Sequence, residues 1–177
     1  RKLEVLPSKV VITLKPGPRR KIRLVACGNF VDPASAEQKD QCLYASGADA
    51  VCLRYVLKRS AEESWKASVL DIRTAFLNAP LDIEAEGQEP TMVVLKPPSL
   101  LLKTGHVGPK DYYLAQKAMY GLRQSPRCWG VYRDQVLRKL TSPQGHRFVQ
   151  AEAEPNLWSI MLGDGEDEDC DDGGDDD

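Results

Sequence analysis

Several features that would assign a class of protein directly are missing from this sequence. No apolar run approaches the ~20 residues of a membrane-spanning helix, and nothing resembles a secretory signal peptide. The five cysteines form no C-x-x-C pair, and neither His106 nor His146 has a metal-ligand neighbour at helical spacing, which argues against the common zinc-site patterns. We therefore expect an intracellular protein, cytoplasmic or nuclear, with reduced cysteines and no membrane contact.

Acidic residues are unevenly distributed along the chain. The sequence has 24 Lys and Arg against 26 Asp and Glu, a net charge of −2, but ten of the acidic residues lie in residues 164–177, which have no basic residue. The remainder has 24 basic and 16 acidic residues and carries a net charge of +8. A basic body suits a phosphate-backbone partner, although an ordinary soluble surface is the alternative. The acidic block is typical of a disordered, solvated tail.

The length and the turn signals indicate one main domain. The 177 residues fit a single domain or part of a larger one, and the first residue, Arg1, indicates a fragment or a processed piece. Residues 1–17 alternate weakly and end in the turn signal Lys15-Pro16-Gly17-Pro18, so we expect an N-terminal linker there. We expect residues 18–162 to form the domain and residues 163–177 to form the acidic tail.

Hydrophobic periodicity predicts both strands and helices. A strand at 19–26 alternates, with Lys21 and Arg23 on one face and apolar residues on the other. A helix follows the N-cap residue Asp49 and has an apolar stripe on one face, so we expect it to pack against a core. Trp65 is expected to close the end of this helix against the core. Further expected elements are a loop at 31–47, a strand and turn at 68–77, a loop at 81–90, a strand at 92–96 ended by Pro97-Pro98, a second strand or hairpin arm at 112–120, and a helix that starts at Ser125-Pro126 and reaches about Leu140.

A single carboxylate interrupts the apolar run within residues 67–77. Asp71 lies between Leu70 and Ile72, where a charged side chain is costly to bury unless something binds it. A hard carboxylate at a strand end suits magnesium. The alternative is an ordinary turn or capping aspartate.

Four blocks in order resemble the reverse transcriptases, and in particular the copia-type (pseudovirus) branch of the retrotransposons. Residues 21–28 resemble the fingers block of that family, and residues 69–81, with Asp71-Ile72-Arg73-Thr74-Ala75-Phe76-Leu77-Asn78, resemble its motif A. Leu95-Lys96-Pro97-Pro98 resembles a Pro-Pro segment of the family. The fourth block is residues 117–129, which contain Tyr120-Gly121-Leu122-Arg123-Gln124-Ser125-Pro126-Arg127. The resemblance implies an α+β fold, a partial right-hand polymerase with helices packed on an antiparallel palm sheet and a small fingers sheet. It covers residues 21 to about 162, because residues 155–162 resemble the family's strand that precedes the catalytic hairpin, and this implies a strand there.

The resemblance implies roles for three parts of the nucleotide site. Asp71 would be the catalytic metal ligand, and the carbonyl of Ile72 a second ligand, for Mg2+ or Mn2+. Lys21 and Arg23, which project the same way from a strand about 7 Å apart, would grip the triphosphate, with a solvated basic edge as the alternative. Cys27 stands where the family usually has a second arginine, so one customary positive charge is absent.

Further roles follow for residues after the aspartate. Backbone amides of Arg73, Thr74 and Ala75 would receive phosphate oxygens at a helix start. Phe76 would exclude a ribose 2′-hydroxyl and so select deoxynucleotides, or it packs in the core. The remaining assignments are that Tyr120 stacks on a base or sugar, that Gly121 lets the backbone approach the template or nucleotide closely, and that Arg123 meets a phosphate. The alternatives are a core tyrosine, a turn glycine and a surface arginine.

One motif of the family does not occur in this sequence. Nucleotidyl transfer by two metal ions needs several carboxylates, and no Tyr-x-Asp-Asp is present to supply them. The pair Asp171-Asp172 lacks the flanking apolar residues that would hold it on a strand. We therefore expect a truncated RNA-directed DNA polymerase fragment that is inactive alone, whose complete form would use magnesium, deoxynucleotides and an RNA or DNA primer–template. The alternative is a non-catalytic remnant of a retrotransposon polyprotein that binds nucleic acid or a protein.

Overall fold

The computed structural model describes residues 2–30, 45, 47–81 and 91–163. These residues fall into two compact units, which are described separately: Arg1–Ser46 with Ala67–Asp134, and Gly47–Lys66 with Gln135–Asp177. Strands and helices follow one another in mixed order, so the chain is a mixed α/β protein. Within the described ranges, no helix has the length and apolar character needed to cross a membrane.

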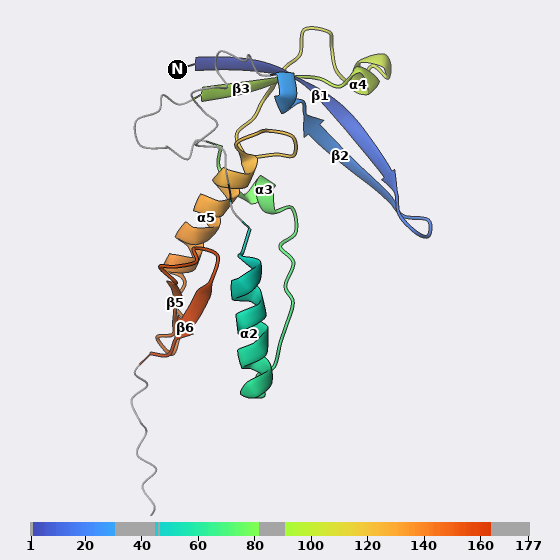
Figure 1. The fold of residues 1–177 in the computed structure, drawn as a ribbon. Helices are drawn as coiled ribbons and strands as arrows, with labels where there is room; N and C mark the ends of the chain where they lie inside the picture. The colour runs from blue at the N-terminus through green and yellow to red at the C-terminus, as the bar shows by residue number, and fades with distance from the viewer. Residues whose placement is uncertain (1, 31–44, 46, 82–90, 164–177) are drawn as a thin grey trace, which may run out of the picture. The chain divides into compact units, whose positions relative to one another are not determined.

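The first unit is built on a four-stranded sheet with the order β2-β1-β3-β4. Figure 1 labels β1, β2 and β3 of this sheet. β1 (Lys2–Leu14) pairs antiparallel with β2 (Arg20–Ala26) and parallel with β3 (Thr91–Lys96). β3 in turn pairs antiparallel with the short β4 (Tyr113–Leu114). The sheet is therefore mixed, because β1 and β3 run in the same direction, whereas the family resemblance implied an antiparallel sheet.

β1 occupies the segment that the sequence predicted to be a linker, so that prediction is wrong. Residues 2–7 of β1 pair with β3, and residues 8–14 pair with β2. Leu6 is 1% exposed in the first half, whereas Ile12 is 56% exposed in the second half. Because the surroundings change along one strand, the regular alternation by which a strand is recognised is weak.

Helical segments lie between and after the strands of the first unit. They are η1 (Gly28–Phe30), α3 (Ala75–Asn78), α4 (Ser99–Lys103) and α5 (Ser125–Lys139), whose last residues belong to the second unit. β3 ends before Pro97 and Pro98, and α5 begins at Ser125, both as predicted. The buried Ser125 hydroxyl donates to the Met119 carbonyl oxygen at 2.6 Å and accepts from the Met119 N–H at 3.0 Å, which fixes the chain ahead of α5.

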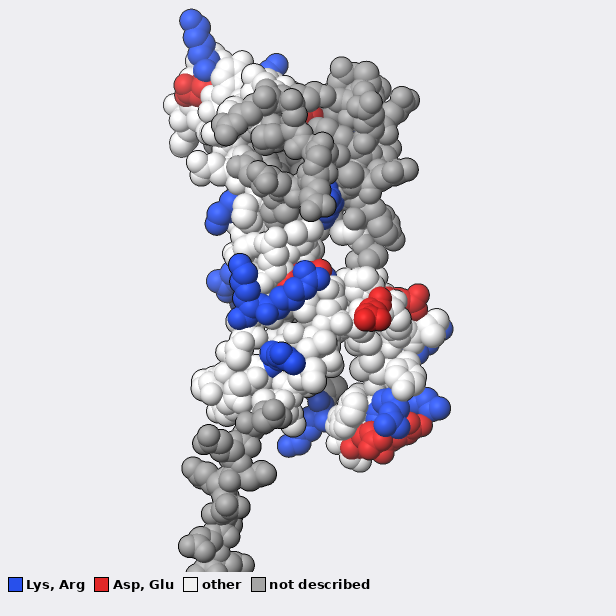
Figure 2. All heavy atoms as spheres, turned by 90° about the vertical axis from the view of Figure 1, so that its left-hand side faces the viewer, with Lys and Arg blue, Asp and Glu red and all other residues white. Residues whose placement is uncertain are grey.

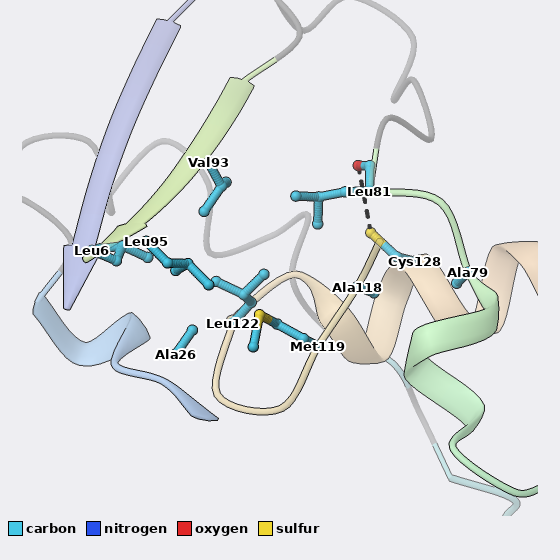
Figure 3. Close-up of a cluster of buried hydrophobic side chains, with 10 residues drawn as sticks. All are labelled: Leu6, Ala26, Ala79, Leu81, Val93, Leu95, Ala118, Met119, Leu122 and Cys128. Carbon is cyan, nitrogen blue, oxygen red and sulfur yellow. Dashed lines mark hydrogen bonds between the residues drawn. The ribbon is translucent and has the colours of Figure 1, made fainter. Parts of the chain in front are cut away.

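The core of the first unit is small and lies between the sheet and the segment before α5 (Figure 3). Cys128 is buried in it, and its thiol contacts the Leu81 carbonyl oxygen at 3.9 Å. Cys128 is therefore a small hydrophobic residue of this core, whereas Cys52 is only half-buried. The cluster consists of Leu6, Ala26, Ala79, Leu81, Val93, Leu95, Ala118, Met119, Leu122 and Cys128.

The second unit contains α2 (Ala50–Glu62) and a hairpin of β5 (Arg147–Gln150) and β6 (Trp158–Met161). The predicted N-cap is confirmed, because the Asp49 carboxylate accepts from the Val51 N–H at 2.6 Å. Elsewhere in this unit, the guanidinium of Arg138, near the end of α5, lies over the ring of Trp158 in β6, 5.9 Å from the ring centroid. The predicted strand at 155–162 thus corresponds to β6, and it is shorter than expected.

Side chains of α2 are more exposed than the sequence predicted. No residue of α2 is buried, although the apolar stripe was expected to pack against a core. Trp65, expected to close the helix end against the core, is 59% exposed. The residues that follow it, 66–72, form no helix or strand that could cover the indole. The acidic block at 164–177 and most of the two predicted loops, at 31–44 and 82–90, lie outside the described residues.

Candidate functional site

The two candidate triphosphate-binding cations lie on the inward-facing side of β2. Lys21 and Arg23 are both half-buried, whereas Ile22, between them, is 64% exposed. The alternation predicted for this strand is therefore confirmed, with the basic face turned toward the protein. A cation held partly out of water keeps a stronger interaction with an anion than a cation in free solution, because solvent screens it less.

Arg23 is held by an aromatic ring and has an unsatisfied nitrogen. Its guanidinium carbon lies 5.7 Å from the centroid of the Tyr120 ring, within the range of a cation–π contact. Its Nε is buried and has no hydrogen-bond partner among the described residues. A buried donor without an acceptor is costly, by roughly 1–3 kcal/mol, so this nitrogen is suited to an acceptor supplied by a bound anion.

Tyr120 also contacts Phe76, the residue that was predicted to lie under the sugar. The two ring centroids are 5.3 Å apart and the ring planes meet at 68°, an edge-to-face arrangement. Phe76 is half-buried and packs against the core of the first unit. The alternative of core packing is therefore confirmed for Phe76, and the exclusion of a ribose 2′-hydroxyl stays a prediction.

Two glycines allow the segment around Tyr120 to approach the end of β2. The Ala26 N–H donates to the Tyr120 carbonyl oxygen at 2.9 Å, and the Gly28 N–H donates to the Gly121 carbonyl oxygen at 3.1 Å. Gly121 has a φ of +90°, and a Cβ placed on it would lie 1.9 Å from the Ala26 carbonyl oxygen. Only glycine fits here, because the chain turns and passes close to β2, as the alternative of a turn glycine predicted. A close approach of Gly121 to a template or nucleotide stays a prediction.

Gly28 is a residue of this site to which the sequence assigned no role. A Cβ placed on Gly28 would lie 2.3 Å from the Gly121 carbonyl oxygen and 3.3 Å from the backbone nitrogen of Arg123. The sequence signal was present, because Gly28 closes the 21–28 block, but its partner is 93 positions away at Gly121. Arg123 follows in the same loop, with an exposed side chain.

The start of α3 is a tight turn with little helix behind it. Thr74 adopts a left-handed conformation, with φ of 51° and ψ of 42°, and its hydroxyl donates to the Arg73 carbonyl oxygen at 2.8 Å. The Thr74 side chain therefore caps no amide of the helix. α3 has only four residues, so the dipole at its first amides, including that of Ala75, is weak. Phosphate binding by these amides stays a prediction.

Asp71 is not held in the way that the sequence predicted. Residues 66–72 form no strand, and Asp71 is exposed, with Val69 96% and Leu70 93% exposed beside it. A strand requires a hydrogen-bonded neighbour, and no described strand pairs with this segment. The strand predicted around Asp71 is therefore wrong, whereas the predicted turn is present at residues 73–74. The argument from burial does not apply to Asp71.

The described residues do not assemble a metal centre around Asp71. Within the described part of the chain, no group of three or more His, Cys, Asp or Glu is arranged to hold a metal ion. One exposed carboxylate with a neighbouring carbonyl, that of Ile72, does not fit a site for two divalent cations, which need several oxygen ligands each. The site that this structure does assemble is therefore the cluster of Arg23, Phe76 and Tyr120, beside Lys21 and Gly121, and we call it the β2 cluster.

Comparison with known proteins gives one family. The model of the family described as reverse transcriptase (RNA-dependent DNA polymerase) matches residues 3–166. No curated protein and no solved structure matches the chain.

Proposed function

The chain belongs to the reverse transcriptase (RNA-dependent DNA polymerase) family, and from this premise we propose that it is a fingers-and-palm portion of a copia-type enzyme that binds the triphosphate of a deoxynucleotide. The observation that carries the proposal is the half-buried Arg23 guanidinium, which lies over Tyr120 with its Nε unsatisfied. A guanidinium fixed in this way offers a planar set of donors to phosphate oxygens.

Lys21 supplies a second charge to the same ligand. It lies two residues before Arg23 on the same half-buried face of β2, so both cations project in one direction. Lysine acts as a compact point charge and arginine as a directional donor, so the pair suits a polyphosphate with several anionic oxygens. Arg123, in the loop after Tyr120, is a further candidate contact for the same ligand or for a template phosphate.

Catalysis is assigned only to the complete enzyme in this proposal. Asp71 and the Ile72 carbonyl would contribute to one Mg2+ or Mn2+ site, and the metal would supply charge stabilisation during nucleotidyl transfer. The described residues do not complete that site, and the sequence contains no Tyr-x-Asp-Asp. We therefore derive no chemical step for this chain and propose that it binds nucleotide without extending a primer.

The test is calorimetric titration of the chain with a deoxynucleoside triphosphate in magnesium buffer. We expect Arg23→Gln to weaken binding by about 10- to 100-fold, because charge-assisted hydrogen bonds are lost. Arg20→Gln is the matched control, since Arg20 lies on the same strand with an exposed side chain and changes the net charge equally. Equal losses in the two variants would mean that only overall charge matters, and absence of binding by the parent chain would overturn the proposal.

A second candidate is a non-catalytic module that binds a nucleic acid backbone. On the face drawn in Figure 2, Lys and Arg side chains are more widespread than Asp and Glu side chains. Together with the net charge of +8 outside residues 164–177, this favours a polyanionic partner over a neutral one. The two candidates differ in their ligand, because the first requires a triphosphate at Arg23 and the second requires only a run of backbone phosphates.

A further inference from the structure

Tyr120 is the one described residue whose ring contacts both Arg23 and Phe76. The Arg23 guanidinium lies 5.7 Å from the ring centroid, and the Phe76 ring centroid lies 5.3 Å from it. These neighbours come from different elements, since Arg23 is in β2 and Phe76 is in α3. Neither contact uses the phenolic hydroxyl, because both are contacts of the aromatic ring. A single side chain thus connects the candidate phosphate-binding residue to the candidate sugar-contacting residue.

The backbone around Tyr120 is fastened to both of those elements. On one side, the Ala118 N–H donates to the carbonyl oxygen of Ala79, the residue that follows α3, at 2.9 Å. On the other side, the Ala26 N–H at the end of β2 donates to the Tyr120 carbonyl oxygen at 2.9 Å. Met119, between them, has both backbone groups bonded to the buried Ser125 hydroxyl. The ring therefore stands on a fixed backbone between α3 and β2.

A ring fixed in this way restricts the two side chains that rest on it. A long arginine side chain loses much rotational freedom when it binds an anion, and prior contact with a ring reduces that loss. Phe76, in edge-to-face contact with the same ring, is held at a set distance from the guanidinium. A shift of the Tyr120 ring would therefore move the phosphate contact and the sugar contact together.

From this arrangement we infer that Tyr120 is a positioning residue, whose ring sets both the affinity for the triphosphate and the discrimination between deoxyribose and ribose. The inference rests on the proposed nucleotide binding and deepens it. It states that affinity for phosphate and selectivity for sugar are coupled through one aromatic ring. It also states that the hydroxyl is dispensable, which separates Tyr120 from a residue that bonds the ligand through its oxygen.

The experiment measures the dissociation constants of a deoxynucleoside triphosphate, the matching ribonucleoside triphosphate and inorganic tripolyphosphate by calorimetry in magnesium buffer. Tyr120→Leu removes the ring, and we expect it to weaken tripolyphosphate binding about fivefold and to bring the two nucleotide constants together. Tyr120→Phe keeps the ring, and its constants are expected to lie within about twofold of those of the parent. Tyr112→Leu is the control, since Tyr112 is an exposed tyrosine of the same unit.

A double variant separates positioning from a general structural effect. In the Arg23→Gln background, Tyr120→Leu should cause no further loss of tripolyphosphate affinity, because the ring acts on phosphate through Arg23. A further loss of similar size in that background would overturn the inference. Circular dichroism checks that each variant is folded, and Tyr120→Met replaces Tyr120→Leu if the latter is not.

The outcomes separate the inferred role of Tyr120 from the proposed binding of nucleotide on which it rests. Parent-like affinity and selectivity in folded Tyr120→Leu would overturn the coupling and leave nucleotide binding standing. A loss in Tyr120→Phe equal to that in Tyr120→Leu would assign the role to the hydroxyl and overturn it as well. Absence of triphosphate binding by the parent chain would overturn both.

Discussion

At the scale of single residues, Glu154 is the buried carboxylate of the second unit. Its carboxylate accepts from the Asn156 N–H at 2.9 Å and from the Asp49 N–H at 3.1 Å, so it joins the residue before α2 to the turn before β6. The backbone hydrogen bond from Asn156, and then that from Asp49, lower the pKa of Glu154 below its usual 4.5, although burial opposes them. The ionised carboxylate therefore contributes to the stability of this unit.

We predict that Glu154→Gln lowers the melting temperature of the second unit at neutral pH and makes its stability less dependent on pH. Because the pKa of Glu154 is lower in the folded than in the unfolded chain, its contribution is complete above about pH 4.5 and is lost as the pH falls through the folded pKa. Thermal melts followed by circular dichroism between about pH 7 and pH 3 test this prediction.

Glu152→Gln is the matched control, since Glu152 is an exposed glutamate two residues away. At neutral pH, the melting temperature of Glu152→Gln should lie closer to that of the parent chain than the melting temperature of Glu154→Gln does. If Glu154→Gln kept the parent's full decline in stability between pH 5 and pH 3, the stabilising role of this carboxylate would be refuted.

Residue types and spacing indicated some members of the β2 cluster, but their contacts could not be predicted from them. Alternation on β2 predicted that Lys21 and Arg23 share a face, which is a local property of a strand. The contact between Arg23 and Tyr120 joins positions 97 apart, and no periodicity encodes such a pairing. Gly28 was missed for the same reason, because its need for a small side chain arises from Gly121.

At the scale of elements, the segment that carries Asp71 is the weakest part of the candidate site. Residues 66–72 have no regular structure, and no backbone hydrogen bond joins the 66–72 amides to another described residue. Exposed apolar side chains at Val69 and Leu70 add no packing. Local stability of this kind, with few buried contacts and solvated amides, lies at the low end for a folded protein.

We predict that the amides of residues 67–72 exchange with solvent deuterium within seconds, whereas those of β1 and β3 exchange far more slowly. The cause is the ladder of hydrogen bonds that pairs residues 2–7 with residues 91–96 and is missing at 67–72. Hydrogen–deuterium exchange followed by mass spectrometry resolves the two segments. Slow exchange at residues 67–72, comparable with that of β3, would show that these amides are hydrogen-bonded, as in the strand that the sequence predicted.

Local signals predicted the elements that depend on local causes. α2 begins after its N-cap Asp49 and β3 ends before Pro97, because a capping carboxylate and a proline act on adjacent residues. Ser125, predicted to be the N-cap of α5, is instead its first residue, and its hydroxyl bonds Met119. The errors at β1 and at 68–77 concern strands, whose existence depends on a partner distant in sequence. The weakly alternating residues 2–14 pair with other strands and form β1, whereas the apolar segment before Asp71 pairs with no described strand.

At the scale of the whole molecule, the net charge bears on nucleic-acid binding, and the number of clustered carboxylates bears on nucleotidyl transfer. The chain outside residues 164–177 carries a net charge of +8, which favours association with a nucleic acid backbone. Catalysis of nucleotidyl transfer needs several carboxylates around two metal ions, and the described residues assemble no such group. The charge therefore supports the nucleic-acid partner proposed above, and nucleotidyl transfer stays assigned to the complete enzyme.

We predict that the purified chain binds an RNA–DNA primer–template and does not extend the primer when deoxynucleotides and magnesium are supplied. Binding measured by fluorescence anisotropy should weaken steadily as salt rises, because each phosphate neutralised by Lys or Arg releases a counterion. In the extension assay, Asp71→Ala should match the parent chain, since a lone exposed carboxylate holds no second metal ion.

Extension by the parent that disappears in Asp71→Ala would show that carboxylates outside the described residues complete the site. Duplex binding that is insensitive to salt would instead remove the basis for a polyanionic partner, and the positive charge outside residues 164–177 would then be an ordinary soluble surface.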